Sequence, residues 1–239
     1  MKFLFRILRR LVGYLLGVLL VALIAAAATF GWQGYKLYQS AVQATPLETL
    51  YQSITARPSF VPYDQLPQTY IDAVLSVEDS RFVHHHGVDP LSIARALWAD
   101  LRSGTLAEGG STITQQLAKN LYFTQERSFI RKAAEMFMAF RLEQTYTKDE
   151  ILELYVNSIY FGDGYYCVRD ASEGYFGKEP GEMTDYESTL LAGIPNAPSV
   201  YSLTANPDLA EQRQQYVLRQ MEKYGYLDAQ EANAILQNG

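Results

Sequence analysis

An uncharged apolar run near the start of the chain constrains its fold more than any other feature. Residues 11–35 carry no charge, and Leu11 to Trp32 is almost entirely apolar. A helix of that length rises about 1.5 Å per residue and would span about 33 Å, enough to cross the hydrocarbon core of a bilayer. A cleavable signal peptide is the alternative, because small residues at 25–28 could serve as a cleavage site, but the run is longer than a signal core. We therefore predict a transmembrane helix over residues 11–32.

The residues on either side of this run predict its orientation. Four cations precede it, and positively charged residues tend to stay on the cytoplasmic side. These cations are Lys2, Arg6, Arg9 and Arg10. Aromatic residues follow the run at the position of an interfacial belt. We therefore expect the amino terminus to be cytoplasmic and the rest of the chain to lie outside.

The part beyond the span is acidic. Of the 20 Lys and Arg residues, four precede the span, which leaves 16 against 26 Asp and Glu and a formal net charge of about −10. Such a charge argues against nucleic acid as a partner and against general adhesion to anionic lipid. The single cysteine, Cys167, excludes an internal disulfide.

Local signals predict a mainly α fold. Capping boxes begin at Thr147 and Thr184, with a close variant at Asp228, and Asp89-Pro90 and Asn206-Pro207 each begin a further helix. Only residues 160–168 are rich in aromatics and glycine without a helical period, so we predict a short hairpin there. The expected organisation is a cytoplasmic tail (1–10), a transmembrane anchor (11–32), a juxtamembrane segment (33–57) and an extracytoplasmic domain (58–239).

The segment from Gly109 to Asn120 predicts a binding site. It holds two glycines, three hydroxyls, three amides and a lysine. Its apolar residues fall on one helical face, namely Ile113, Leu117 and Ala118. A second face would carry Ser111, Gln115 and Lys119. A helix cap explains one hydroxyl at most, so the remainder predicts a long, hydroxylated, anionic ligand.

A basic cluster follows directly. Four cations lie between residues 119 and 132, opposed only by Glu126; they are Lys119, Arg127, Arg131 and Lys132. A charge run usually marks a solvated helix face. This run lies inside an acidic domain, which favours a local site for a pyrophosphate.

Five blocks of this sequence, in order, resemble the motifs of the peptidoglycan glycosyltransferases, glycosyltransferase family 51. The first is Glu78-Asp79-Ser80-Arg81-Phe82-Val83-His84-His85-His86-Gly87, and the second is the Gly109–Asn120 segment. The others are Arg131-Lys132-Ala133-Ala134-Glu135, then residues 148–157, then residues 175–178 with 190–195. The resemblance covers about residues 58 to 203.

The resemblance implies a fold and an activity. The fold would be a lysozyme-like, two-lobed helical domain after the single transmembrane helix. The activity would be polymerisation of lipid II into β-1,4-linked glycan strands, with inversion and release of the polyprenyl diphosphate. No Ser-x-x-Lys with a later Lys-Thr-Gly follows the matched region, so a monofunctional enzyme is expected.

Two carboxylates are the predicted catalytic residues. Glu78 ends an apolar segment and should be half-buried, which raises a carboxylate pKa toward neutrality. The resemblance implies that Glu78 is the general base for the acceptor 4-hydroxyl. Glu135 lies three and four residues from Lys132 and Arg131, the spacing of a helical ion pair. The resemblance implies that Glu135 lies at the leaving pyrophosphate and helps to hold it through a divalent cation (Mg²⁺ or Mn²⁺) or through adjacent basic residues.

The remaining site residues are predicted to bind substrate. Lys119, Arg127 and Lys132 match the pyrophosphate-binding cations of the family. Ser111 and Gln115 are expected at sugar or phosphate oxygens, and Asn157 at the substrate cleft, more as a brace than as a contact. No organic cofactor is expected.

Three local features are set apart from the chemistry. Three adjacent histidines, 84–86, cannot all face one ion, so no metal site is predicted, and His85 should make a structural hydrogen bond. Asp79 is interpreted either as a residue supporting the catalytic carboxylate or as a helix end. Cys167 and Arg169-Asp170 depart from the family pattern, which affects the expected local backbone more than activity.

Two rival functions remain open at this stage. A lysozyme-like lytic enzyme would need no pyrophosphate cluster and no anchor, and an inactive scaffold would not need both carboxylates. The expected partners are lipid II, the growing glycan strand, the membrane and other cell-wall synthases. The expected location is the bacterial cytoplasmic membrane.

Overall fold

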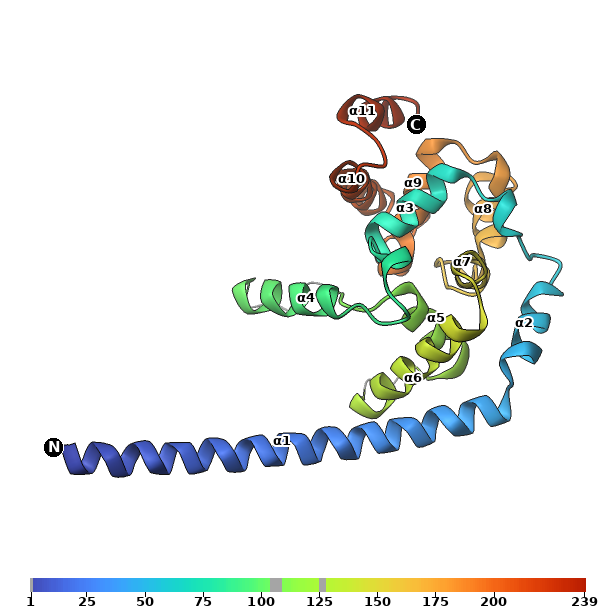
Figure 1. The fold of residues 1–239 in the computed structure, drawn as a ribbon. Helices are drawn as coiled ribbons and strands as arrows, with labels where there is room; N and C mark the ends of the chain where they lie inside the picture. Colours follow the sequence, from blue (N-terminus) through green and yellow to red (C-terminus); the bar gives the residue numbers. More distant parts are fainter. Residues whose placement is uncertain (1, 104–108, 125–127) are drawn as a thin grey trace.

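A computed structural model describes residues 2–103, 109–124 and 128–239 of the chain (Figure 1). Within these ranges the chain forms helices joined by loops, and no strand is present. The prediction of a mainly α fold that follows one long apolar helix is confirmed.

The first helix, α1 (Lys2–Ala44), runs unbroken through the predicted span and into the juxtamembrane segment. Its segment Phe5–Ala44 is long and apolar enough to cross a membrane, with a mean hydropathy of 2.6 in its most apolar window. Its described side chains are exposed up to Phe30, and Gly34 is the first buried residue. An exposed apolar surface of this kind fits a membrane anchor.

The helix α2 (Leu47–Thr55) follows a break at Pro46, where proline removes a backbone donor. Leu47 and Ile54 of α2 are buried in the hydrophobic core. Although α2 belongs to the predicted juxtamembrane segment, it packs as part of the folded domain.

The other helices follow in chain order. They are η1 (Tyr63–Gln65), α3 (Gln68–Glu78), η2 (Phe82–His84), α4 (Pro90–Ser103), α5 (Ile113–Tyr122), α6 (Phe129–Thr145), α7 (Lys148–Val156), α8 (Val168–Phe176), η3 (Pro180–Glu182), α9 (Asp185–Gly193), η4 (Ile194–Asn196), α10 (Pro207–Tyr224) and α11 (Ala229–Gln237). The capping boxes predicted at Thr147, Thr184 and Asp228 are all confirmed, because each side chain accepts from its N3 backbone amide. The helices predicted at Pro90 and Pro207 begin at those residues.

The helices pack in two groups (Figure 1). In one group α3 packs against α9 and α10, and α11 covers α9 and α10. In the other, α6 packs against both α1 and α5, while α7 contacts α5 and α6. The predicted apolar face of α5 is confirmed, since Ile113, Leu117 and Ala118 are all fully buried. α3 ends and α5 begins where the two groups meet, and that junction positions the site.

The hairpin predicted for residues 160–168 is wrong. The segment is a tight loop in which the Phe161 N–H donates to the Tyr165 carbonyl at 2.8 Å. Three successive residues, Gly162, Asp163 and Gly164, have φ of 87°, 51° and 91°. The segment forms no strand, and α8 begins at Val168, the last residue of the predicted hairpin. The Asp163 carboxylate supports the turn by accepting from the Ser202 and Thr204 hydroxyls.

Candidate active site

Glu78 is the last residue of α3, and its two carboxylate oxygens differ in their surroundings. The Gln116 side-chain amide donates to Oε2 at 2.7 Å. Oε1 is buried and has no hydrogen-bond partner among the described residues. Burial raises the pKa of Glu78 above its usual range, opposed by the Gln116 hydrogen bond and by the charges of Arg213 and Lys119. A carboxylate with a raised pKa and a bare oxygen is suited to accept a proton.

Asp79 fixes the junction beside this base. It is buried and accepts from the His85 Nε2–H at 2.9 Å and from the Ile113 backbone N–H, at the start of α5, at 3.0 Å. His85 Nδ1 accepts from the Gly87 N–H at 3.2 Å, so the ring hydrogen is on Nε2 and donates to Asp79. The structural hydrogen bond predicted for His85 is confirmed. Asp79 therefore ties the end of α3 to the first turn of α5.

Gly87 brings the first motif against two further helices. Its φ is 91°, and a Cβ there would lie 2.9 Å from the Ala139 backbone of α6. Its carbonyl accepts from the Thr112 hydroxyl at 2.7 Å. Only glycine combines that backbone conformation with so close a contact. Gly87 therefore fixes α5 relative to α6.

The two glutamine side chains of α5 have different surroundings, which the predicted polar face of this helix did not anticipate. α5 begins at Ile113, and Thr112 and Gln115 close a capping box at its start. Gln115 is buried in that box, whereas Gln116 faces Glu78. The Thr-x-x-Gln pattern is itself a capping signal, and it could have identified Gln115 as a cap from the sequence. The substrate contact predicted for Gln115 stays a prediction, and Gln116 is a site residue that sequence reasoning missed.

Glu135 lies on α6 and is paired on both oxygens. Arg131 Nε is 2.9 Å from Oε1, and Lys132 Nζ is 3.2 Å from Oε2. The helical ion-pair spacing read from the sequence is thus realised. Lys132 Nζ also donates to Ser111 Oγ at 2.6 Å, which joins α6 to the segment before α5. The structure therefore brings Ser111, Lys132 and Glu135 together as one group.

Lys119 lies between the two carboxylates. Within the described ranges its ammonium group has no hydrogen-bond or ion-pair partner. Burial, followed by the charges of Arg131 and Lys132, lowers the pKa of Lys119, while Glu135 and Glu78 both raise it. A partly buried cation without a partner is a favourable place for an incoming anion.

The two remaining predicted site residues are Arg127 and Asn157. Arg127 lies outside the described residues. Asn157 is buried at the end of α7, where its amide accepts from the Val61 N–H at 2.9 Å and donates to the Val61 and Glu153 carbonyls. Those bonds tie α7 to the connector that precedes α3. The substrate contact predicted for Asn157 stays a prediction, and the bonds observed are those of a brace.

A further missed residue is Arg213 of α10. Its charge lowers the pKa of Glu78, and its guanidinium lies 4.7 Å from the Tyr216 ring centroid. No local sequence pattern indicates this contact, because α10 reaches α3 only through the tertiary packing.

Cys167, where the chain departs from the family pattern, begins α8. Its sulfur accepts from the Asp170 N–H at 3.4 Å and donates to the Ser59 carbonyl at 3.7 Å. Its φ of −151° is ordinary extended backbone. Burial raises the pKa of the thiol, which therefore stays protonated at neutral pH. The departure leaves the backbone regular, and the residue works as a helix cap.

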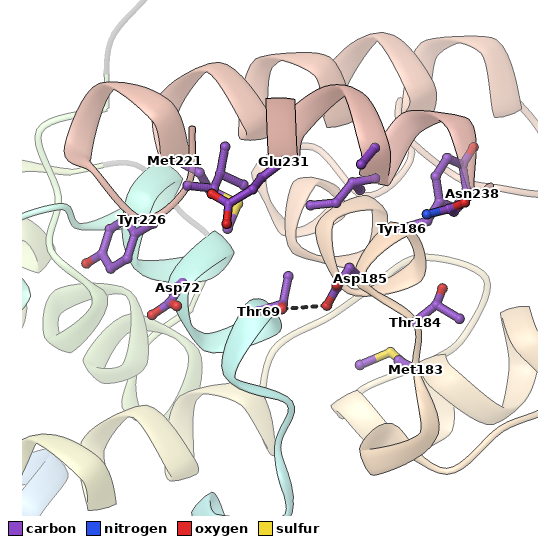
Figure 2. Close-up of a pocket in the computed structure, with 13 residues that line it drawn as sticks. Thr69, Asp72, Met183, Thr184, Asp185, Tyr186, Met221, Tyr226, Glu231 and Asn238 are labelled. Atoms are coloured by element: carbon purple, nitrogen blue, oxygen red, sulfur yellow. Dashed lines mark hydrogen bonds between the residues drawn. The ribbon is translucent and has the colours of Figure 1, made fainter. Parts of the chain in front are cut away.

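A cavity of about 630 Å³ lies away from all these residues, between the start of α3, the start of α9 and α11 (Figure 2). Its charged lining is acidic, from Asp72, Asp185 and Glu231, and Thr69 bonds to Asp185 across it. Such a lining repels a diphosphate. The group around Glu78 and Glu135 is therefore the candidate active site.

This arrangement defines a class of protein by its parts: a helical domain attached to an apolar helix, with a buried carboxylate at the end of α3 and a carboxylate paired with cations on α6. The sequence profile of the transglycosylase family matches residues 44–222. The chain belongs to the transglycosylase family.

Two relatives of more than 40% identity agree with this assignment. Penicillin-binding protein 1F of Bacillus subtilis is 45% identical over 172 residues, 72% of this chain and 24% of that protein. A candidate transglycosylase of Cupriavidus necator is 42% identical over 75% of this chain and 77% of its own length. A crystal structure of penicillin-binding protein 1A from Haemophilus influenzae superposes with a TM-score of 0.45 and 25% identity, over 75% of this chain and 17% of that one. The chain spans about a quarter of the length of the penicillin-binding proteins it matches.

Proposed function

We propose that this protein is a membrane-anchored peptidoglycan glycosyltransferase that polymerises lipid II into β-1,4-linked glycan strands. Family membership supports the reaction class. The observation that carries the proposal is a pair of groups on neighbouring helices that have no partner among the described residues, Glu78 Oε1 and the Lys119 ammonium. Sugar transfer from a diphosphate needs both a base for the acceptor and a cation for the leaving group.

In the proposed mechanism, Glu78 Oε1 accepts the proton of the acceptor sugar's 4-hydroxyl. The freed oxygen attacks the anomeric carbon of the donor, the bond to the diphosphate breaks, and the configuration inverts. Gln116 holds Oε2 and so fixes which carboxylate oxygen faces the acceptor. No covalent enzyme intermediate is needed, because one displacement completes the transfer.

The leaving diphosphate is proposed to bind at Lys119 and Lys132. Lys132 is already oriented by Ser111 and Glu135, and Lys119 adds a charge whose ammonium group pairs with none of the described residues. Fixed cations at a departing phosphoryl group typically supply several kcal/mol to the transition state. Glu135 in this scheme orients Arg131 and Lys132.

The described side chains do not by themselves form a binding site for a divalent ion such as Mg²⁺ or Mn²⁺. The described residues contain no cluster of three metal-ligating side chains, and both oxygens of Glu135 face cations. An ion carried in by the diphosphate would need few protein ligands.

The packing of α6 on α1 supports a membrane location. Phe129 at the start of α6 is 77% exposed, and its ring lies 5.7 Å from that of Phe30 near the end of the apolar run. Arg131 and Lys132 follow within one helical turn. The cations therefore lie near the level of a lipid headgroup, on the side opposite the basic amino terminus. The proposed location is the bacterial cytoplasmic membrane, with the domain extracytoplasmic.

Other cell-wall synthases are proposed as partners alongside the lipid and the glycan strand. The support is that several relatives carry this domain within much longer penicillin-binding proteins.

The test is polymerisation of purified lipid II by the full chain in proteoliposomes, comparing Glu78→Gln with Glu211→Gln on the exposed face of α10. Loss of a general base lowers the rate by about 10²- to 10⁴-fold. We expect that loss for Glu78→Gln and none for Glu211→Gln. Failure of the unchanged chain to make polymer would reject the proposal, and cleavage of preformed glycan instead would identify a lytic enzyme.

A further inference from the structure

The contact between α1 and α6 is unusually close at one residue, Gly34. A Cβ at that position would lie 2.5 Å from the Cβ of Ala133, 2.9 Å from the Ala134 nitrogen and 2.9 Å from the Ile130 carbonyl oxygen. Carbon atoms in ordinary contact are about 3.5–4.0 Å apart. These neighbours are backbone atoms and a Cβ, so no rotamer change can make room. Any side chain at Gly34 must therefore push the helices apart or tilt one of them.

The surrounding contacts show that the two helices run parallel and in a fixed register. Phe30 meets Phe129, and Tyr35 meets Phe137 with ring centroids 5.3 Å apart. The residues of α6 that face α1 are spaced at i, i+3, i+4 and i+7, namely Ile130, Ala133, Ala134 and Phe137. This spacing forms a single helical stripe, and α1 lies along α6 in Figure 1.

The side of α6 opposite α1 carries the residues that are proposed to bind the diphosphate of the donor substrate. Arg131, Lys132 and Glu135 interleave with the α1-facing residues, and Lys132 reaches Ser111 beside α5. One helix thus has the anchor on one face and the diphosphate cations on the other. A movement of α6 against α1 changes the position of those cations relative to the apolar run.

The sequence also gives the position of this contact relative to the end of the predicted membrane span. Gly34 follows Trp32, the end of the predicted span, by two residues, or about 3 Å along a helix. Small residues allow such backbone contact between helices at the membrane boundary. A lipid-linked diphosphate lies at that boundary because its chain is held in the bilayer.

We propose that Gly34 is a positioning residue that sets the height and tilt of the diphosphate site relative to the membrane surface. This inference rests on the proposed function. A displacement of about 1 Å can cost about 100-fold in rate when it misplaces a bound reactant. The effect of losing Gly34 should therefore depend on whether the donor is fixed in a bilayer.

The chain offers a matched control at Gly31, one turn earlier on α1, where an added Cβ would meet nothing within 4 Å. The experiment compares Gly34→Leu, Gly34→Ala and Gly31→Leu in the full chain. Each is assayed with lipid II in proteoliposomes and with a disaccharide diphosphate on a short polyprenyl chain that stays in solution. Circular dichroism and the unfolding midpoint check the fold.

We expect Gly34→Leu to lose at least tenfold in kcat/KM in proteoliposomes while keeping the soluble-donor rate within about threefold. Gly34→Ala should show a smaller loss in the same direction, and Gly31→Leu should match the unchanged chain in both assays. Equal losses with both donors would overturn the inference in favour of a purely structural contact. Unchanged rates with both donors for both Gly34 variants would overturn it as well. Absence of polymer from the unchanged chain would instead reject the proposed function.

Discussion

The two carboxylates of the site show how one chemical group is given two different tasks. Glu78 has one hydrogen-bonded oxygen and one buried oxygen without a partner. Glu135, also buried, has a cation at each oxygen. Burial without charge neutralisation prepares a base, whereas burial with two cations makes a fixed negative centre that holds those cations in place. The comparison predicts that substitutions on the two sides should fail in different ways.

The largest combined effect is expected for Glu135→Gln. The change leaves Arg131 and Lys132 without their counter-charge, so both activity and fold should suffer. Breaking a buried pair costs about 3–5 kcal/mol, and the partial exposure of Lys132 reduces this to about 2–3 kcal/mol. Urea unfolding of the full chain in detergent measures the loss, with Glu211→Gln as the control. A variant that loses only activity would show that Glu135 acts on substrate directly.

A smaller but cleaner effect is expected for Lys119→Met. Polymerisation should fall about 100-fold, because a cation at the leaving group is lost. Because the pKa of Lys119 is lowered, the folded state holds this charge at some cost. The cost is full below the folded pKa, declines as the pH rises from there toward the unfolded pKa, and is gone above it. Unfolding at pH 7 should therefore show unchanged or slightly higher stability. A stability loss above 1 kcal/mol would contradict the assignment of Lys119 to the anion site.

The smallest effect is expected for Gln116→Ala, and it concerns pH. The Gln116 amide stabilises the charged form of Glu78 and holds its pKa down. Without that hydrogen bond the pKa rises further, so the base form is lost at a higher pH as the solution is acidified. The acid limb of the kcat/KM profile should move to higher pH, with about a tenfold loss near neutrality. Gln215→Ala, on the exposed face of α10, is the control; an unmoved acid limb would exclude Glu78 as the titrating base.

Sequence reasoning succeeded where short-range rules decide the structure. Caps and prolines located α4, α7, α9, α10 and α11. A side chain three residues away satisfies the start of α7, α9 and α11. α4 and α10 begin at a proline, which has no backbone donor to satisfy. Sequence reasoning failed where the surroundings of a side chain depend on how a helix is capped or on segments that are distant in the sequence. Gln115 was assigned to the ligand-facing side of α5, but it closes the capping box with Thr112, and Gln116 is the glutamine that meets Glu78.

Other misses have the same tertiary origin. The influence of Arg213 on Glu78 requires the packing of α10 on α3, and the role of Gly34 requires α6 beside α1. A glycine in an apolar helix looks the same in the sequence whether it faces open space, as Gly31 does, or another backbone. The loop at 160–168 was mistaken for a hairpin because a segment rich in aromatics and glycine without a helical period fits a hairpin and a tight loop equally well.

The unbroken course of α1 into the α6 contact has a consequence for how such an enzyme meets its donor. A flexible linker would let a domain explore a volume above the membrane. A stiff helix that passes from the bilayer directly into the domain holds the site within a thin layer instead. Donor and enzyme then search for each other in two dimensions, so turnover should follow the number of donor molecules per unit area of leaflet rather than their concentration in the surrounding volume.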